Sequence, residues 1–235
     1  MKKSFTLAEV LITLAVIGIV ASLTIPIVIR NYQERQTVTS LKKFYSDINQ
    51  AFQMATVHKG KIENAGITDS TELFEYFKPY LKISKICGTK GNSDCFYKGE
   101  YTTLNPSVPW SWKNFTPNEK TNYYKVVMSN GVSVWFSGDS VNCGTKLGKK
   151  PYDAVCGAIG VDLNGVKKPN RLGVDTFYFR VTKYGNYPME VDNVGYGNLN
   201  HFCKLSSTEK TNGYACTAWV IIKGNMDYLK HDISW

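Results

Sequence analysis

The sequence predicts an α+β protein, with a long N-terminal helix that spans a membrane in its first half and packs on an antiparallel β-sheet head in its second. Three observations predict this fold. Residues 5–29 form an apolar run with one acid, Glu9, and no base before Arg30. A helical pattern with one apolar face follows, and beyond Lys82 the pattern changes to strands and turns.

The apolar run is long enough to cross a membrane. A helix over residues 5–29 would be about 37 Å long, compared with about 30 Å for the hydrocarbon layer. A buried core helix is normally far shorter. A secretory signal peptide would have a longer basic region and a small-residue cleavage site after the run, where this chain has Arg30 and Asn31. Lys2 and Lys3 place the N-terminus in the cytoplasm and the rest of the chain, past the anchor, outside it.

Glu9 is unusual because a carboxylate inside a membrane costs a few kcal/mol to bury, which marks it as a functional residue that needs a partner. The residues Met1–Ser4, followed by Phe5–Ile12, closely resemble the leader and cleavage site of type IV pilins and type II secretion pseudopilins. Gly18 and Pro26 also fall where that family has its mid-helix glycine and its helix-breaking proline. A pilin-like fold is therefore expected, with a kink or a melted segment just before Pro26.

The resemblance implies how the chain is processed and assembled. It implies that a prepilin peptidase cuts between Ser4 and Phe5 and methylates the new Phe5 amine. Glu9 would then meet the Phe5 ammonium of a neighbouring subunit. Ser4 stands where the family usually has Gly, which bears on the efficiency of cleavage. The implied partners are the membrane, an assembly platform, and copies of this chain or other pilin-like subunits in a helical filament.

Four segments follow from these patterns. Residues 1–4 are a leader, 5–29 a transmembrane helix, 30–58 an amphipathic continuation of that helix, and 59–235 a globular head. Gly60 ends the helix. The apolar face of the continuation recurs at steps of three and four residues: Val38, Leu41, Tyr45, Ile48, Phe52 and Ala55.

The head begins with a helical pattern and continues with strand patterns. A short helix is expected over Asp69–Lys78, capped by Asp69 and stopped by Pro79. The turn Ser129-Asn130-Gly131 separates two strand patterns and predicts a hairpin. A further segment alternates apolar and polar residues and predicts a half-buried strand, and a short apolar run is one more strand candidate. These four strand segments are 124–128, 132–136, 174–182 and 217–222.

Six cysteines lie in the head and none in the anchor. Outside the cytoplasm an even number favours disulfides over free thiols. Six cysteines allow fifteen pairings, and each sequential pair would close a short polar loop that contributes roughly 2–3 kcal/mol. No pair has the spacing of a zinc knuckle. The clustering favours Cys87–Cys95, Cys143–Cys156 and Cys203–Cys216.

The sequence has no recognisable catalytic motif, and an enzyme is the weaker hypothesis. The three histidines are far apart, and neither an H-E-x-x-H nor a G-x-S-x-G pattern occurs. Asp162, Asn164 and Asp175 are weak candidate ligands for calcium, which takes oxygen donors. Lys167 and Lys168 in the same loop would repel a cation, so a turn fixed by the Asp and Asn side chains is the favoured interpretation. No other cofactor is expected.

The net charge is +9, and residues 59–235 carry 22 basic and 16 acidic side chains. Together with Trp110 and Trp112 this balance is compatible with DNA binding. Along the sequence the charges are scattered, which favours a moderately basic, soluble head. The leading hypothesis is a structural subunit of a type IV pilus or a type II secretion pseudopilus. It would sit in the inner membrane with its head outside the cytoplasm, and then enter a periplasmic or extracellular filament. The alternative is a minor or competence pilin whose head binds DNA or a surface.

Overall fold

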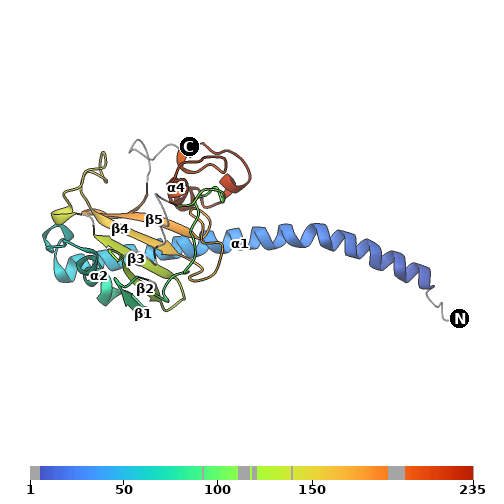
Figure 1. Ribbon diagram of the computed structural model, residues 1–235, viewed down its shortest axis with the longest axis horizontal. Helices are drawn as coiled ribbons and strands as arrows, with labels where there is room; N and C mark the ends of the chain where they lie inside the picture. Colours follow the sequence, from blue (N-terminus) through green and yellow to red (C-terminus); the bar gives the residue numbers. More distant parts are fainter. Residues whose placement is uncertain are drawn as a thin grey trace. The chain divides into compact units, whose positions relative to one another are not determined.

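The computed structural model describes residues 6–91, 93–110, 117, 121–138, 140–189 and 199–234. The chain forms two compact units, Met1–Gln36 and Thr37–Trp235. The predicted α+β class is confirmed: a long apolar N-terminal helix, α1, is followed by a head built on a six-stranded antiparallel sheet (Figure 1).

Helix α1 spans Leu7–Lys59, and its N-terminal part lies in the first unit. An 18-residue window of this helix has a mean hydropathy of 2.6, and none of that window is buried within the protein. In the described part of the chain, α1 is the one helix long and apolar enough to cross a membrane. Its apolar side chains therefore need a non-aqueous surrounding.

Pro26 lies inside α1, and the helix continues through it. Of the two predicted alternatives before Pro26, the melted segment is thus wrong, and the kink stays a prediction. A proline removes one backbone hydrogen bond, here the one that residue 26 would donate to the carbonyl of Ser22. The helical bonds on both sides of that gap are kept, and the Ser22 hydroxyl donates to the Ile19 carbonyl at 2.7 Å.

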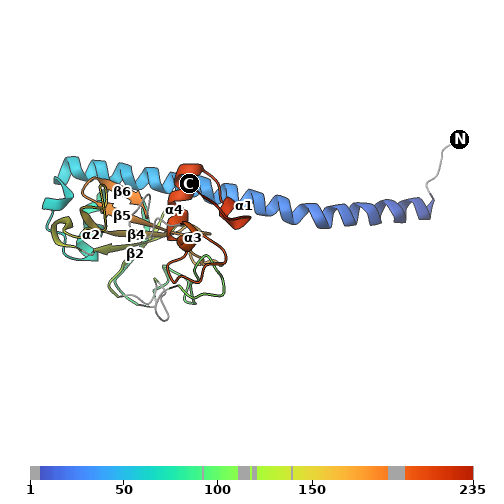
Figure 2. The same ribbon diagram turned by 90° about the horizontal axis from the view of Figure 1, so that it is seen from above.

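In the second unit, the C-terminal half of α1 covers one face of the sheet (Figure 2). The ring of Tyr45 stacks on Phe179 with 5.6 Å between centroids, and Asn49 Oδ1 accepts from the Asn186 backbone N–H at 3.0 Å. Gly60, with φ of +87°, ends the helix as predicted. The predicted apolar face is correct but too narrow, since Phe44 and Ala51 are also buried. The buried α1 residues are Leu41, Phe44, Ile48, Ala51, Phe52 and Ala55.

The short helix expected at Asp69–Lys78 is confirmed as α2, Ser70–Phe77. Asp69 Oδ1 accepts from the backbone N–H groups of Thr71 and Glu72 at 2.7 and 2.9 Å, which satisfies two donors of the first turn. A 3₁₀ turn on either side completes this segment: η1, Ile62–Asn64, and η2, Lys78–Tyr80.

The sheet is a meander, since its spatial order is the order along the chain. The predicted hairpin is confirmed: β2 and β3 pair in antiparallel register around the turn at Asn130-Gly131. Strands β1, β4 and β6 lie where no strand was specified. The strand bounds are β1 Ile83–Gly88, β2 Tyr124–Met128, β3 Ser133–Gly138, β4 Val155–Asp162, β5 Thr176–Thr182 and β6 Gly185–Pro188.

Strand β5 confirms the predicted alternation but is not half-buried. Phe177 and Phe179 enter the core beneath α1. The opposite face is also covered, because Tyr178, 6% exposed, lies in a second core with Trp110 and Trp135. A sheet with both faces covered leaves no polar side for its middle strands.

The strand predicted at 217–222 is wrong, because these residues lie in helix α4, Tyr214–Lys223. A short apolar run fits a buried helix as well as a strand. The helix lies between Gly213 and Gly224, both with positive φ, and the Gly224 N–H donates to the Val220 carbonyl at 3.0 Å. The remaining turns are η3 Val141–Cys143, α3 Leu199–Phe202 and η4 Asp227–Leu229.

Candidate functional site

The start of α1 is closed by a reciprocal pair of hydrogen bonds between Thr6 and Glu9. Glu9 Oε2 accepts from the Thr6 backbone N–H and from the Thr6 hydroxyl, each at 2.8 Å. The Glu9 N–H donates back to Thr6 Oγ1 at 3.3 Å. This is a capping box, in which the residue before the helix and the third helical residue satisfy each other's backbone donors.

The capping box changes the interpretation of Glu9. The resemblance stated above implies one partner for this carboxylate, the Phe5 ammonium of a neighbouring subunit. In the single chain the carboxylate already accepts two hydrogen bonds, both from Thr6. The pattern Thr-x-x-Glu was present in the sequence and is the signal that would have found Thr6. The predicted processing residues Ser4 and Phe5 lie outside the described residues.

Gly18 lies in the middle of the apolar part of α1. It stands between Ile17 and Ile19, whose exposed fractions are 63% and 62%. A Cβ built on Gly18 would meet no atom within 4 Å. In the part of the chain that the structure describes, no close contact requires a glycine at this position.

The head contains three disulfides, and they are the three sequential pairs. Cys87–Cys95 closes the loop after β1, Cys143–Cys156 joins η3 to β4, and Cys203–Cys216 joins the segment after α3 to α4. No cysteine of the described residues is free. Three covalent closures in one head suit an oxidising compartment.

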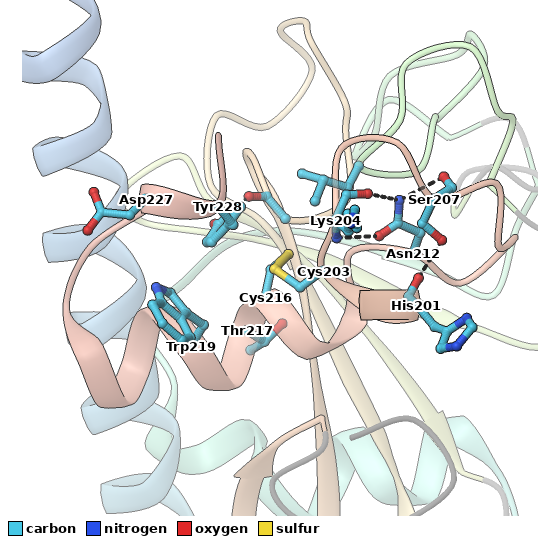
Figure 3. Close-up of a disulfide and its surroundings, with 12 residues drawn as sticks. His201, Cys203, Lys204, Ser207, Asn212, Cys216, Thr217, Trp219, Asp227 and Tyr228 are labelled. Carbon is cyan, nitrogen blue, oxygen red and sulfur yellow. Dashed lines mark hydrogen bonds between the residues drawn. A yellow bond between two sulfur atoms is a disulfide. The ribbon is translucent and has the colours of Figure 1, made fainter. Parts of the chain in front are cut away.

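Figure 3 shows the Cys203–Cys216 disulfide in its surroundings. Asn212, fully buried, ties the enclosed loop together: its Nδ2 donates to the carbonyls of Lys204 and Ser207 at 2.8 and 3.1 Å, and its Oδ1 accepts from the Lys204 N–H at 3.2 Å. A rigid loop on the head surface is the result.

The structure brings Asp162, Asn164 and Asp175 together at the end of β4. Asn164 Nδ2 donates to Asp175 Oδ2 at 2.7 Å, and its backbone N–H donates to Asp162 Oδ1 at 3.3 Å. The Tyr101 hydroxyl donates to Asp162 Oδ2 at 2.8 Å, and the Arg171 N–H donates to Asp175 Oδ1 at 2.6 Å. The carboxylate oxygens therefore face N–H and O–H donors.

This arrangement fits a turn-fixing network and does not fit a calcium site. A calcium ion needs six to eight oxygens whose lone pairs are free to face it, whereas those of Asp162 and Asp175 accept hydrogen bonds. Burial raises the pKa of both carboxyl groups, and the charge of Asp175 raises the pKa of Asp162 further. The described residues hold no group of three His, Cys, Asp or Glu side chains placed to bind a metal.

The tryptophan and histidine side chains considered in the sequence contact other residues of the chain where the structure describes them. Trp110 is 1% exposed and its ring lies in the second core, 5.8 Å from that of Trp135. Trp112 lies outside the described residues. His58, near the end of α1, shares a hydrogen bond of 3.0 Å with the Tyr80 hydroxyl. His201 lies far from it in the sequence, in α3. In the described part of the head, Trp110 is therefore part of the second core together with Trp135.

Residues 1–25 match the family described as the prokaryotic N-terminal methylation motif. The match covers the leader, the capping box and most of the apolar run, and it ends before the head. No curated protein and no solved structure was found to match the chain.

Proposed function

We propose that this chain, which carries the signal motif of type IV pilins and pseudopilins at residues 1–25, is a structural subunit of a type IV pilus or a type II secretion pseudopilus. The observation that carries the proposal is the N-terminus itself: the apolar run of residues 5–29, whose one acid, Glu9, lies within the matched motif. Such a helix is stable in lipid or in a bundle of similar helices, because its apolar surface is then kept away from water.

The assembly is driven by helix packing and by charge pairing. Cleavage after Ser4 creates an ammonium on Phe5, four residues before Glu9. In a filament the ammonium of one subunit pairs with Glu9 of another, which lowers the cost of holding both charges away from water. The disulfide-closed head faces outward and forms the surface of the filament.

The route follows from the same features. The subunit is inserted as a single-pass protein of the inner membrane, with residues 1–4 in the cytoplasm and the head outside. Prepilin peptidase removes the leader and methylates Phe5, and an assembly platform passes the subunit into the filament. The three disulfides support this topology, since a cytoplasmic head would keep its thiols reduced.

The test is the mass and the location of the full chain in its own cells. We expect a mature chain that begins at methylated Phe5 and is found in filaments sheared from the cell surface. An abundant sheared fraction supports the pilus, and a methylated chain confined to the cell envelope supports the pseudopilus. An uncleaved chain that never leaves the membrane contradicts both.

A further inference from the structure

Three asparagines of the head directly precede a glycine: Asn130, Asn164 and Asn212. An asparagine in this position reacts without an enzyme. The main-chain nitrogen of the glycine loses its proton to hydroxide and attacks the side-chain carbonyl carbon, ammonia leaves, and a five-membered imide forms. Glycine favours this ring closure because it has no side chain to hinder the approach. By sequence alone, the three sites are equivalent.

Water then opens the imide at either of its two carbonyl carbons. One opening gives aspartate. The other gives isoaspartate, in which the main chain passes through the former side chain and is one carbon longer. In both products a carboxylate replaces an uncharged amide, with one water consumed and one ammonia released. In a folded chain, the rate depends on whether the side chain is able to turn toward the following nitrogen and on whether the amide nitrogen is held by other residues.

Asn212 cannot turn without breaking its hydrogen bonds. Its side chain is fully buried, its Oδ1 accepts from the Lys204 N–H, and its Nδ2 donates to the carbonyls of Lys204 and Ser207. Figure 3 shows the amide bonded to these two residues. The main chain after it is also packed, because a Cβ built on Gly213 would lie 2.5 Å from Leu172 Cβ. Both reacting groups of this pair are therefore held.

Asn164 is held through its amide nitrogen. Its Nδ2 donates to Asp175 Oδ2 at 2.7 Å and to the Lys168 carbonyl at 3.1 Å. Its Oδ1 is buried from solvent. The next residue has little room, since a Cβ built on Gly165 would lie 2.9 Å from the Gly131 carbonyl oxygen. Loss of ammonia here would replace a donor to the buried Asp175 carboxylate by a like charge, which is costly.

Asn130 is exposed at the tip of the hairpin between β2 and β3, and so is Gly131. In the described part of the chain its Nδ2 makes no hydrogen bond, so the leaving amide faces water. A Cβ built on Gly131 would meet no atom within 4 Å, which shows that the turn is open around the attacking nitrogen. The Gly131 N–H donates to the Met128 carbonyl at 2.9 Å, and this one bond has to open for the attack.

The one hydrogen bond of the Asn130 side chain favours the reaction. The Val132 N–H donates to Asn130 Oδ1 at 3.2 Å, and Val132 is itself 5% exposed. Negative charge develops on this oxygen when the glycine nitrogen attacks the carbonyl carbon, and a fixed donor stabilises that charge. Asn130 thus combines a stabilised carbonyl oxygen with an amide nitrogen that no described residue holds.

We propose that Asn130 is a site of spontaneous deamidation in the folded chain and that the fold protects Asn164 and Asn212. The product carries its new carboxylate on the rim of a groove of about 530 Å³ between α1 and the hairpin, which Lys43 and Lys82 also line. Isoaspartate at this position lengthens the turn that sets the register of β2 and β3. The reaction needs no second subunit, so the proposal does not depend on filament assembly.

The test follows the three sites in one sample. The full chain in a neutral detergent is incubated at mildly alkaline pH, samples are taken over days, and each is digested briefly with trypsin. The three asparagines fall in different tryptic peptides, because lysines separate them. Mass spectrometry detects a gain of about 1 Da for each deamidation, and fragment ions assign it to a residue. A reference sample is unfolded in guanidinium chloride with its disulfides reduced.

In the folded chain we expect Asn130 to react at least about tenfold faster than Asn164 and Asn212, because the two held side chains react only after a local opening. In the unfolded reference the three rates should agree within about threefold, which shows that the difference comes from the fold. Three similar rates in the folded chain, or an Asn130 that stays intact while the unfolded reference reacts, would overturn the proposal.

Asn130→Gln is the control for the assignment. Glutamine would have to close a six-membered ring, which forms far more slowly, so the peptide that contains residue 130 should keep its mass. A mass gain that persists at the same rate in this variant comes from another residue of the peptide, such as Asn142, and contradicts the assignment to Asn130. Because every measurement uses the unassembled subunit, these outcomes leave the proposed filament function untouched.

Discussion

Thr6 and Glu9 satisfy each other's backbone N–H groups across the first turn of α1. Both acceptor atoms are side-chain oxygens, and three contacts of 2.8, 2.8 and 3.3 Å join the pair. In lipid an unsatisfied backbone donor costs several kcal/mol, so a cap at this helix start is worth more than in water. Glu9 therefore has a role within its own subunit in addition to the proposed one between subunits.

The two roles of Glu9 predict different outcomes for two substitutions. Glu9→Gln keeps an oxygen that can accept from the Thr6 N–H but removes the charge, and Glu9→Ala removes both. If charge pairing drives assembly, both variants should insert in the membrane and both should lose about tenfold or more of the sheared filament yield, because an uncharged partner does not offset the buried ammonium. Normal filament yield from Glu9→Gln would contradict the charge-pairing mechanism.

Thr6→Val is the matched control, since it keeps the shape of the side chain and the charge of Glu9 while it removes the hydroxyl. The lost cap costs more at the helix start than the roughly 1 kcal/mol that it would cost in water. We expect filament yield to fall much less than for Glu9→Gln. Membrane insertion, measured by extraction at alkaline pH, should be unchanged in all three variants.

Much of the fold follows from periodicity in the sequence. The apolar face of α1, the capped helix α2 and the hairpin of β2 and β3 each repeat one local pattern over several residues, and each is found in the structure. Helix α4 was predicted as a strand because its apolar residues, 215 to 222, are too few to separate period 2 from period 3.6. Strand β4 was missed because Gly157 and Gly160 weaken its strand pattern.

The candidate sites were predictable to the extent that they are local. The acid in the apolar run and the sequential cysteine pairs could be identified from the sequence. The difference between Asn130 and the other two Asn-Gly sites could not, because the dipeptides are identical and only the fold supplies the hydrogen-bond partners of Asn164 and Asn212. Three identical dipeptides became one exposed and two held sites only through the fold.

Gly160 should not tolerate even one methyl group. It pairs with Trp135 across β3 and β4, and a Cβ at Gly160 would lie 1.7 Å from Trp135 Cζ2. The indole is fully buried and packs against the rings of Phe96, Trp110 and Tyr178. We expect Gly160→Ala to lower the free energy of unfolding by about 3 kcal/mol, measured by urea denaturation of the full chain in detergent.

A double variant tests this cause. Trp135→Phe alone leaves a cavity and is itself destabilising. If the clash is between the methyl group and the indole, Trp135→Phe with Gly160→Ala should cost less than the two single changes together. Simple additivity would show that the Gly160 methyl group acts on something other than Trp135.

Asp162 and Asp175 predict a pH dependence for the stability of the head. Burial raises the pKa of both carboxyl groups in the folded chain. Their contribution to stability is therefore complete below the pKa of the unfolded chain, about 4, and is lost as the pH rises through the higher folded values. We expect the urea midpoint to fall between mildly acidic and neutral pH, as the carboxyl groups of Asp162 and Asp175 lose their protons.

Asp162→Asn isolates that contribution. The amide keeps an oxygen for the Asn164 N–H and a polar group beside the Tyr101 hydroxyl, but it has no charge to bury. The difference in urea midpoint between this variant and the unaltered chain should grow in favour of the variant as the pH rises. A difference that is constant with pH, or that grows in the opposite direction, is incompatible with a raised pKa at Asp162.

The hydrogen bonds of Asn212 predict that this one side chain holds the loop within the Cys203–Cys216 disulfide in its conformation. Asn212→Ala leaves the Lys204 N–H and the carbonyls of Lys204 and Ser207 without this partner, and leaving these partly buried backbone groups unpaired costs about 1 to 2 kcal/mol. The exposed Thr208 in the same loop supplies the control, Thr208→Ala.

We expect trypsin to cut Asn212→Ala within residues 203–216, at Lys204 or Lys210, while the control resists. Because the disulfide joins the two sides of the cut, the fragments should separate on a gel only after reduction. Equal resistance of both variants would show that the disulfide alone holds the loop.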